Sequence, residues 1–562
     1  FLFAALKILE PLYEICLDKM EELANPKFKD FQQELQRVGK HPNRSYFIYK
    51  SIIINNLFGV DIMEEAVEIC KLRLFLKLVA QVDKVDRIEP LPDIDFNIKA
   101  GNTLVGYASL KEIEDIKSKE LLLGDDIVAK VKEADRELSS FRKLQTQIGV
   151  KSSEFRKAKE NIRSKLKEIR DELDKDLALG YGVKTDFKKT YDAWRKAYQP
   201  FHWYVEFYDI MNSGGFDVVV GNPPYVEYRK VEKGYLIDSK VYKTYEAKNL
   251  YVFCVERSNM LLVANGRFGM IIPSSAVGSE KTSCLRDELY NNYGLMHIST
   301  YAIRPSKLFE GVDQRLCIIL CKNFISSEKL LFTTRYHHWH SEERKYLFEK
   351  IEYTKSLNHS RLNRFAQLGS PTAMSILNKI ESKSNKTFGS YLSNGKYGFV
   401  SHYHRSPRYW IRAMDFEQYF KSQRSNRSIH HFRDIYFNIE KEGKALSGIV
   451  NSTLYFFWFM SVCNGRNITG KDVSEYPVGV FANERINSLS HIFENLMDDY
   501  KQNSIIRKRV DCEYQEFKPS KSKAVIDDID RVLSAHYGFS DEENDFIINY
   551  EIKYRIGSQC DD

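Results

Sequence analysis

Asn222-Pro223-Pro224-Tyr225 is the segment whose residue types point most directly to chemistry. This tetrad directly follows an apolar run, residues 216–221, that is typical of a buried strand. The two prolines fix φ and remove two N–H donors, so the turn presents carbonyl oxygens with little freedom to move. Because ligands bind beyond the carboxyl ends of strands in an open α/β sheet, we expect the tetrad to line a site.

The tetrad suits the methylation of an exocyclic amine, whose lone pair is delocalised into its ring. The Asn222 side-chain oxygen and the Pro223 carbonyl could accept the two amine hydrogens and stabilise the positive charge that develops on nitrogen. Tyr225 would stack on the base, which has to leave the duplex to be reached. A rigid surface turn is the alternative, which the preceding apolar strand and Gly221 disfavour.

The elements around the tetrad predict a doubly wound α/β fold. Apolar runs at residues 57–61, 216–220, 268–272 and 316–320 are typical of strands buried on both faces of a mostly parallel sheet. Helical spacing follows the first of these runs, at Val67, Cys70 and Leu74.

An inserted helical hairpin is predicted over residues 110–179. Gly149 to Ser153 could turn the chain between its two helices. The hairpin is a structural arm or a DNA clamp. The prediction rests on two apolar seams with coiled-coil-like spacing, formed by Ile127, Val131, Ala134, Leu138 and Phe141 and by Ile162, Leu166, Ile169 and Leu173.

The pattern changes twice further along the chain. Residues 326–482 form short mixed segments rich in Tyr, His, Arg and Ser, and helical spacing returns from residue 483. We therefore expect a catalytic domain over 1–325, a mixed α+β domain over 326–482 and a helical region over 483–562.

Composition permits a polyanion partner without requiring one, since 84 basic residues stand against 77 acidic ones, for a net charge of +7. Nine cysteines without a C-x-x-C pair indicate reduced thiols, and the apolar run at 454–460 is far short of the ~20 residues that span a bilayer. No signal peptide is seen, so we expect a cytoplasmic protein without membrane contact.

The chain resembles the methylase half of type IIG restriction–modification enzymes and related adenine-specific DNA methyltransferases of class I fold. Besides the tetrad, the segments at 57–62, 97–102, 266–273 and 304–309 carry this resemblance. It implies S-adenosylmethionine as cofactor, double-stranded DNA as partner and a C-terminal target-recognition domain. Asp61 would hold the cofactor's ribose hydroxyls and Asn102 its adenine amine; a helix cap and a turn residue are their respective alternatives.

Two departures from the family stand out. Its glycine-rich first motif, which precedes a helix like residues 1–9, is absent, and the chain begins at Phe1 without an initiator Met. We therefore expect a missing N-terminal segment, and leave open whether a nuclease domain or partner lies upstream and whether this chain alone is active. The second departure is Ser274-Ser275-Ala276, where relatives often place an aromatic ring.

Aromatic and basic residues interleave in the expected recognition domain, as they do where proteins contact DNA. Ordinary solvated surface is the alternative for each. No metal is expected at the histidine-rich run 337–340, because neither a carboxylate nor a cysteine lies at ligand spacing. The candidate DNA contacts are Arg405, Arg408, Tyr409, Arg412, Arg466 and Asn467.

The sequence thus predicts a site-specific DNA methyltransferase that modifies adenine N6 within a restriction–modification or phage-defence system. Cytosine N4 is an alternative target, because it is also an exocyclic amine whose lone pair is delocalised into its ring. Protein glutamine methylation, which uses the same tetrad, and a truncated DNA-binding remnant without activity are the remaining alternatives.

Overall fold

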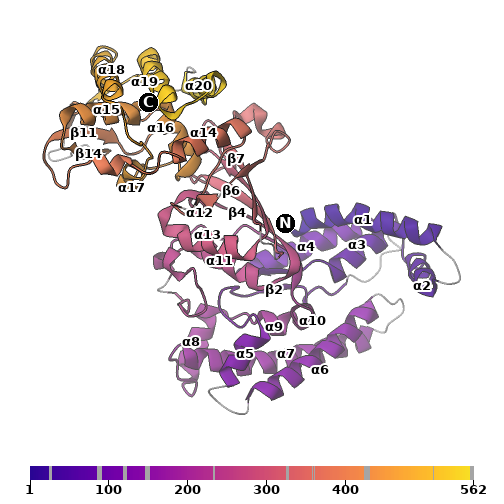
Figure 1. Cartoon of the computed structure of the whole chain (residues 1–562). Helices are drawn as coiled ribbons and strands as arrows, with labels where there is room; N and C mark the ends of the chain where they lie inside the picture. The colour runs from indigo at the N-terminus through magenta and orange to yellow at the C-terminus, as the bar shows by residue number, and fades with distance from the viewer. Residues whose placement is uncertain are drawn as a thin grey trace. The chain divides into compact units, whose positions relative to one another are not determined.

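A computed structural model describes residues 1–23, 28–84, 92–117, 123–145, 152–231, 234–324, 328–356, 358–359, 361–422, 431–510 and 512–556 (Figure 1). The chain forms two compact units, Phe1–Met270 and Ile271–Asp562. The domain boundaries expected near 325 and 482 stay predictions.

The first unit is mainly helical, with short strands between the helices (Figure 1). Its helices are α1 (Leu2–Glu22), α2 (Lys29–Val38), α3 (Arg44–Asn55), α4 (Glu64–Val79), α5 (Leu110–Lys117), α6 (Leu123–Gln145), α7 (Ser152–Gly180), α8 (Lys188–Tyr198), α9 (Trp203–Glu206), α10 (Tyr208–Asn212) and α11 (Leu250–Met260). Its strands are β1 (Gly59–Asp61), β2 (Ile98–Ala100), β3 (Phe216–Gly221) and the first part of β4 (Leu262–Pro273).

Helices α6 and α7 lie side by side as the predicted hairpin, and all nine seam residues are buried (Figure 1). The helices are antiparallel, because Lys130 Nζ lies 2.8 Å from Glu172 Oε1 and Lys165 Nζ lies 2.6 Å from Glu133 Oε1. The turn expected at Gly149 to Ser153 falls largely outside the described residues. The hairpin could be predicted from the sequence because a heptad pattern depends only on residues that are close together along the chain.

The strands of the first unit form two parallel pairs. β1 pairs with β2, and β3 pairs with β4, with Val219 opposite Phe268. Phe58, just before β1, lies with its ring centroid 5.9 Å from that of Phe216 at the start of β3. One aromatic cluster therefore anchors the beginnings of both strands.

Two expectations about strands are wrong. β3 is not buried on both faces, since Val218 is 55% and Val220 48% exposed. The six-stranded sheet, in the order β3-β4-β6-β5-β7-β8, is mixed rather than mostly parallel. β5 (Leu295–Tyr301) pairs antiparallel with β6 (Leu316–Lys322) and parallel with β7 (Leu330–His337), which pairs antiparallel with β8 (Thr354–Ser356). Alternating strand directions cannot be read from apolar runs alone.

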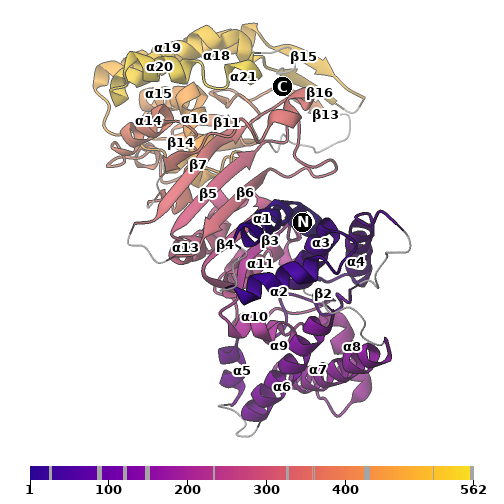
Figure 2. The same cartoon turned by 90° about the vertical axis from the view of Figure 1, so that its right-hand side faces the viewer.

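The second unit continues with small sheets and a helical layer, in which α18, α19 and α20 are grouped (Figure 2). Its helices are α12 (Ser275–Gly278), α13 (Ser283–Asn292), α14 (Pro371–Glu381), α15 (Glu440–Asn451), α16 (Thr453–Val462), α17 (Gly470–Ser474), α18 (Asn483–Gln502), α19 (Lys523–Tyr537), α20 (Asp541–Ile548) and α21 (Ile552–Arg555). Its short strands are β9 (Asn358–His359), β10 (Arg364–Phe365), β11 (Phe399–His404), β12 (Ala413–Met414), β13 (Phe420–Ser422), β14 (Phe432–Phe437), β15 (Ile505–Lys508) and β16 (Cys512–Glu516).

The region after residue 483 is not purely helical, contrary to expectation. α18 begins at Asn483 as the spacing predicts, but a β-hairpin of β15 and β16 follows it. β16 pairs antiparallel with β13, so that Phe420 lies opposite Tyr514. This pairing joins segments almost a hundred residues apart, which no local pattern reveals.

A large hydrophobic cluster with members from Ala302 to Tyr554 lies in the second unit. At its centre is α16, in which every residue is buried. Among the described residues, no single helix is long and apolar enough to cross a membrane; α15 and α16 meet that test only as a pair bent by 63°.

Candidate functional site

The tetrad lies where the sequence predicts, directly after β3. Asn222 and Pro224 are exposed and Pro223 is buried. The chain that follows is fixed by backbone hydrogen bonds to the start of α11. Leu250 N donates to the Val226 carbonyl at 3.0 Å, and residues 227 and 249 form an antiparallel bridge. The tetrad is thus a short loop held at both ends.

Within the loop, the Tyr225 hydroxyl donates a hydrogen bond to Asn222 Oδ1. Sequence reasoning gave these two side chains separate roles and missed this contact. An amide oxygen has two lone pairs, so Asn222 can accept the tyrosine hydroxyl and still accept one further N–H. The contact therefore orients the acceptor that amine chemistry needs without using it up.

Asp61 lies at the carboxyl end of β1, and Asn102 follows the carboxyl end of the neighbouring β2. The register places Asp61 opposite Ala100, and Gly101 N donates to the Asp61 carbonyl at 2.8 Å. The two predicted cofactor residues are therefore close together. Asp61 is exposed, and its Oδ1 accepts the Met63 N–H at 2.9 Å, as a helix cap would. Its second oxygen can still accept a ligand hydroxyl.

Asn102 is buried, with only 3% of its surface exposed. Its Oδ1 accepts the Leu104 N–H at 3.1 Å, and its backbone N donates to the Gln199 carbonyl at 2.8 Å. Burial raises the pKa of Tyr235 to about 12, against a small lowering by the Asn102 side chain beside it. These contacts fit the role of a turn residue, and a direct cofactor contact stays a prediction.

A hydrophobic cluster links this turn to the segment after the tetrad. Leu104, Tyr228, Tyr242 and Phe253 are among its buried members. The Tyr242 hydroxyl also donates to the Leu104 carbonyl at 2.8 Å. Since Leu104 is two residues past Asn102 and Tyr228 three past Tyr225, the structure brings both motifs to one packed region of the first unit.

In the second unit, two separately predicted groups of DNA contacts meet. Ile468 N donates to the Arg405 carbonyl at 2.8 Å, and Ser406 Oγ donates to Asn467 Oδ1 at 2.6 Å. Arg466 is exposed at the tip of this loop, after Gly465 with φ of 63°. Sixty residues of sequence separate the two groups, and the fold makes them one surface.

The aromatic members of the interleaved pattern belong to the core instead. Tyr409 is 8% exposed, which leaves its ring little surface for DNA, and Trp410 is 2% exposed. Arg555 fixes this segment from the C-terminal end of the described chain. Its Nε donates to the Tyr409 carbonyl at 3.1 Å, and its guanidinium lies 3.9 Å from the centre of the Trp410 ring. Arg408 and Arg412 on either side are thereby held in place.

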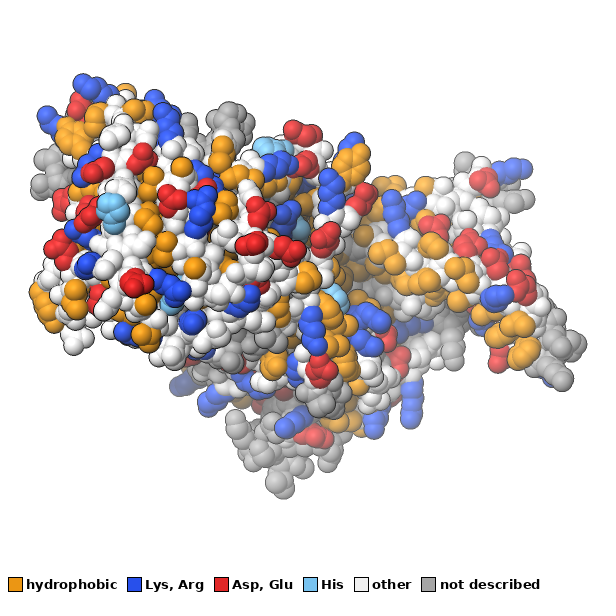
Figure 3. Space-filling model, turned by 45° about the horizontal axis from the view of Figure 1, so that its top comes forward, with side chains coloured by type: hydrophobic (Ala, Val, Ile, Leu, Met, Phe, Trp, Pro, Cys, Tyr) orange, Lys and Arg blue, Asp and Glu red, His pale blue; other side chains and the backbone are white. Residues whose placement is uncertain are grey.

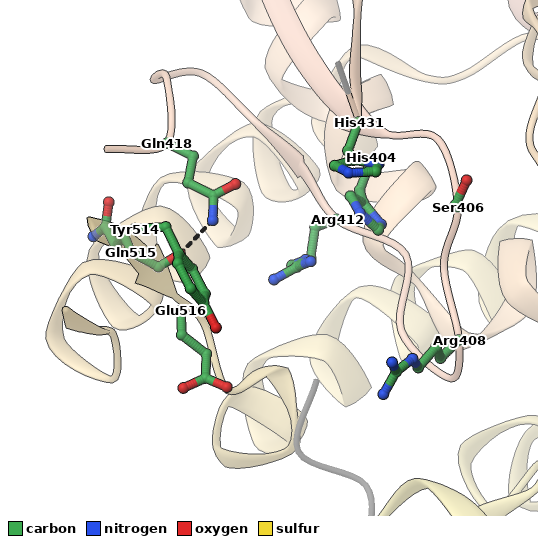
Figure 4. A pocket seen from close by; sticks show the side chains of 9 residues that line it. All are labelled: His404, Ser406, Arg408, Arg412, Gln418, His431, Tyr514, Gln515 and Glu516. Atoms are coloured by element: carbon green, nitrogen blue, oxygen red, sulfur yellow. Dashed lines mark hydrogen bonds between the residues drawn. The ribbon is translucent and has the colours of Figure 1, made fainter. Parts of the chain in front are cut away.

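Arg408, which is exposed, and Arg412, which is largely buried, both line a cavity of about 280 Å³ (Figure 4). Arg412 extends into its middle, between the histidines on one side and Tyr514 on the other (Figure 4). Burial, with the charge of Arg412 beside it, lowers the pKa of His404 to about 3. Sequence reasoning missed most of the lining, which β11, the segment after it and β16 supply together: His404, Ser406, Arg408, Arg412, Gln418, His431, Tyr514, Gln515 and Glu516.

Comparison with known proteins gives a consistent family. Residues 55–309, which include Asp61, Asn102 and the tetrad, match the Eco57I restriction-modification methylase family. The Methanocaldococcus jannaschii protein RM.MjaORFECS2P is 29% identical over 399 residues, 62% of this chain and 33% of that protein. The Escherichia coli type II restriction enzyme and methyltransferase RM.Eco57I is 23% identical over 250 residues, 41% of this chain and 25% of that protein.

The chain thus spans a third or less of the length of these relatives. Among solved structures, the type IIL restriction-modification enzyme MmeI in complex with DNA matches 98% of this chain and 77% of its own, at 11% identity and a TM-score of 0.40. The type IIG restriction endonuclease BpuSI matches 60% of this chain and 54% of its own, at 9% identity and a TM-score of 0.22. Both TM-scores are below 0.5, so the assignment rests on the family match and the sequence relatives. Residues 55–309, somewhat less than half of the chain, are therefore similar to a restriction-modification methylase domain of the Eco57I type.

Proposed function

We propose that this chain transfers a methyl group from S-adenosylmethionine to N6 of an adenine flipped out of double-stranded DNA. The observation that carries the proposal is the tetrad itself, an exposed Asn222 acceptor on a loop fixed at both ends, inside a restriction-modification methylase domain. Rigid acceptors aimed where positive charge develops are what this chemistry needs.

The residues of the loop have different roles in the proposed reaction. Asn222 Oδ1 and the Pro223 carbonyl accept the two hydrogens of the target amine, which concentrates the lone pair on nitrogen for attack on the methyl carbon. The proton leaves after the transfer, so no general base is needed beforehand. Tyr225 stacks on the base and orients Asn222 through its hydroxyl.

The cofactor residues support the proposal unequally. S-adenosylmethionine supplies the methyl group when bound, and Asp61 fits the role of holding its ribose hydroxyls, because the carboxylate is exposed at a strand end and keeps one oxygen for a ligand. Asn102 fits less well as a direct contact, because only 3% of its surface is exposed. We propose that Asn102 shapes the turn beside the cofactor.

DNA as substrate is supported by the basic surface of the second unit. Arg405, Arg408, Arg466 and Asn467 are the members of the predicted set that keep exposed or half-exposed side chains. Cytosine N4 remains the rival target, since the tetrad treats both amines alike. No structural observation favours protein glutamine over DNA.

The test uses labelled S-adenosylmethionine and mixed-sequence duplex DNA with the chain and with Asn222→Ala. We expect label in DNA, loss of more than about 100-fold on substitution, as for other groups that stabilise developing charge, and N6-methyladenine after digestion to nucleosides. Absence of label, or label that Asn222→Ala does not reduce, would overturn the proposal. N4-methylcytosine in the digest would retain the methyltransferase and replace the base. Label on protein without DNA would indicate glutamine instead.

A further inference from the structure

Three arginines of the second unit form a group of positive charges, which we call the arginine cluster. Arg304 and Arg315 belong to the loop between β5 and β6, and Arg466 follows the turn at Gly465. Within the part of the chain that the structure describes, none of these three guanidinium groups forms an ion pair or a hydrogen bond. Arg304 and Arg315 have no role in the proposed methyl transfer.

Arg315 is the most enclosed member of the arginine cluster. Its carbonyl accepts the Ser274 N–H at 2.9 Å, which fixes the backbone just before β6. Its guanidinium lies 5.2 Å from the centre of the Tyr336 ring, and its Nε and Nη1 are buried without a hydrogen-bond partner among the described residues. Because a cation withdrawn from water is unfavourable unless its donors are paired, we expect an acceptor from outside the described chain.

The turn at Gly465 brings Arg466 to the same place. Gly465 has φ of 63°, and a Cβ added there would lie 2.9 Å from Arg315 Nη1. Glycine adopts this φ without strain and leaves that room. Burial raises the pKa of Tyr336 to about 12, and the charges of Arg315 and then Arg466 oppose that rise. Both guanidinium groups therefore lie near the Tyr336 hydroxyl, although 150 residues of sequence separate them.

Asp313, in the same loop as Arg304, does not neutralise the cluster. Its exposed carboxylate lies 2.8 Å from Lys307 Nζ. That contact lowers the pKa of Asp313, and the charges of Arg304 and Arg466 lower it further. Since a lysine already pairs with this carboxylate, the three arginines keep a net positive charge.

We propose that the arginine cluster binds the DNA backbone through its phosphate groups, with Arg315 as the enclosed contact and Arg304 and Arg466 as the exposed ones. Guanidinium groups bind phosphate oxygens through parallel N–H groups, a geometry that lysine cannot reproduce. The backbone supplies oxygen acceptors, each phosphate with one negative charge, to donors that have none in the described chain.

The position of the cluster supports DNA as the source of these phosphates. Asn467, next to Arg466, accepts a hydrogen bond from Ser406, which joins the cluster to the predicted DNA contact Arg405. The proposed DNA surface thus extends to the loop between β5 and β6, for which the sequence predicted no DNA contact. Such contacts would position the duplex without reading its sequence. The assignment to DNA rests on the proposed function.

The experiment measures binding of the full chain to a fluorescent mixed-sequence duplex across a series of NaCl concentrations, without cofactor. Losing one phosphate contact lowers the slope of log K against log [salt] by about 1. We expect this decrease for Arg304→Gln and for Arg466→Gln, which are both exposed and should fold normally. Arg531→Gln is the matched control, because it removes one exposed arginine of α19 that pairs locally with Asp528.

Arg315→Lys tests the enclosed contact separately, because it keeps the charge and loses the Nε donor. We expect binding to weaken by about 10-fold or more, as for other hydrogen bonds to charged groups. Unchanged binding by this variant would mean that water satisfies the buried donors, and would overturn the role of Arg315.

The other outcomes separate the cluster from the methyltransferase proposal. Slopes for Arg304→Gln and Arg466→Gln equal to that of Arg531→Gln, with binding retained, overturn the cluster and leave methyl transfer intact. If inorganic phosphate raises Tm at constant ionic strength, and Arg315→Lys abolishes that shift without affecting DNA binding, a free phosphate is the ligand and the DNA source is overturned. A chain that binds no duplex also overturns that source. Lowered slopes without any methyl incorporation support the cluster and overturn only the proposed function.

Discussion

The two compact units differ in how their buried apolar side chains are grouped. In Ile271–Asp562, a large cluster has members from Ala302 to Tyr554 and includes α16, in which every residue is buried. In Phe1–Met270, the buried residues form several separate clusters. Exposed apolar side chains there include Val218 and Val220 on β3 and a stripe on each of two helices: Ile8, Leu12 and Ile15 on α1, and Ile69, Leu72 and Leu76 on α4. Apolar side chains are visible among charged ones on the outer surface of α1 (Figure 3, right).

The two units also hold their candidate functional residues in place by different kinds of contact. The tetrad and Asp61 stand at strand ends of the first unit, where short hydrogen-bonded loops hold them. The cavity lined by Arg408 and Arg412 lies in the second unit, where the buried Arg555 holds the segment between these two residues. Substitutions should therefore act on stability mainly in the second unit and on chemistry mainly in the first.

The largest stability effect is expected within α16. Phe459 is fully buried, so Phe459→Ala should lower the free energy of unfolding of the second unit by about 3–5 kcal/mol. Leu76→Ala is the matched change in the first unit, at a side chain that is 61% exposed, and should stay within about 0.5 kcal/mol. Urea unfolding followed by tryptophan fluorescence would measure both. Equal losses would refute the packing contrast.

Acid should act on the second unit through Asp530. This buried carboxylate accepts the Thr453 N–H at 3.1 Å and the Leu454 N–H at 2.9 Å, and burial raises its pKa to about 6 from a model-peptide value of 3.8. The folded state therefore binds the proton more tightly than the unfolded state. As pH rises from about 4 to about 6, stability should fall in the wild type, and Asp530→Asn should remove that fall from Tm profiles. A parallel profile in the variant would contradict the assignment.

Asp95 in the first unit should respond with the opposite sign. Burial alone would raise its pKa, but Lys159 at 2.7 Å and Lys71 at 2.8 Å lower it to about 2. Its contribution is present above the unfolded value of 3.8 and is lost as pH falls towards 2. Asp95→Asn should destabilise at pH 7 and become neutral near pH 2, which hydrogen exchange of α4 and α7 would detect. A constant difference across that range would argue against these ion pairs.

The smallest effect is expected at the tetrad's internal contact. Tyr225→Phe keeps the ring and removes the hydroxyl that orients Asn222. A neutral hydrogen bond contributes about 0.5–1.5 kcal/mol, so kcat should fall roughly 2- to 12-fold with KM for DNA unchanged. A rise in KM with kcat unchanged would show that the hydroxyl contacts DNA instead.

Local patterns in the sequence predicted much of this molecule. The spacing of residues that are close in the sequence was enough to predict three features. These are the α6–α7 seam, the start of α18 and the position of the tetrad after β3. The exposure of β3 and the antiparallel strands could not be predicted, because they depend on which strands become neighbours. The cavity lined by Arg408 and Arg412 likewise depends on the pairing of β13 with β16, about ninety residues away in the sequence.

The most direct test measures methyl incorporation and the DNA salt slope in the same two variants. We predict that Asn222→Ala loses methyl transfer and keeps the wild-type slope, because the tetrad performs the chemistry. Arg466→Gln should keep kcat at saturating DNA and lower the slope by about 1. If Asn222→Ala retained methyl transfer, the assignment of the tetrad to the reaction would be contradicted.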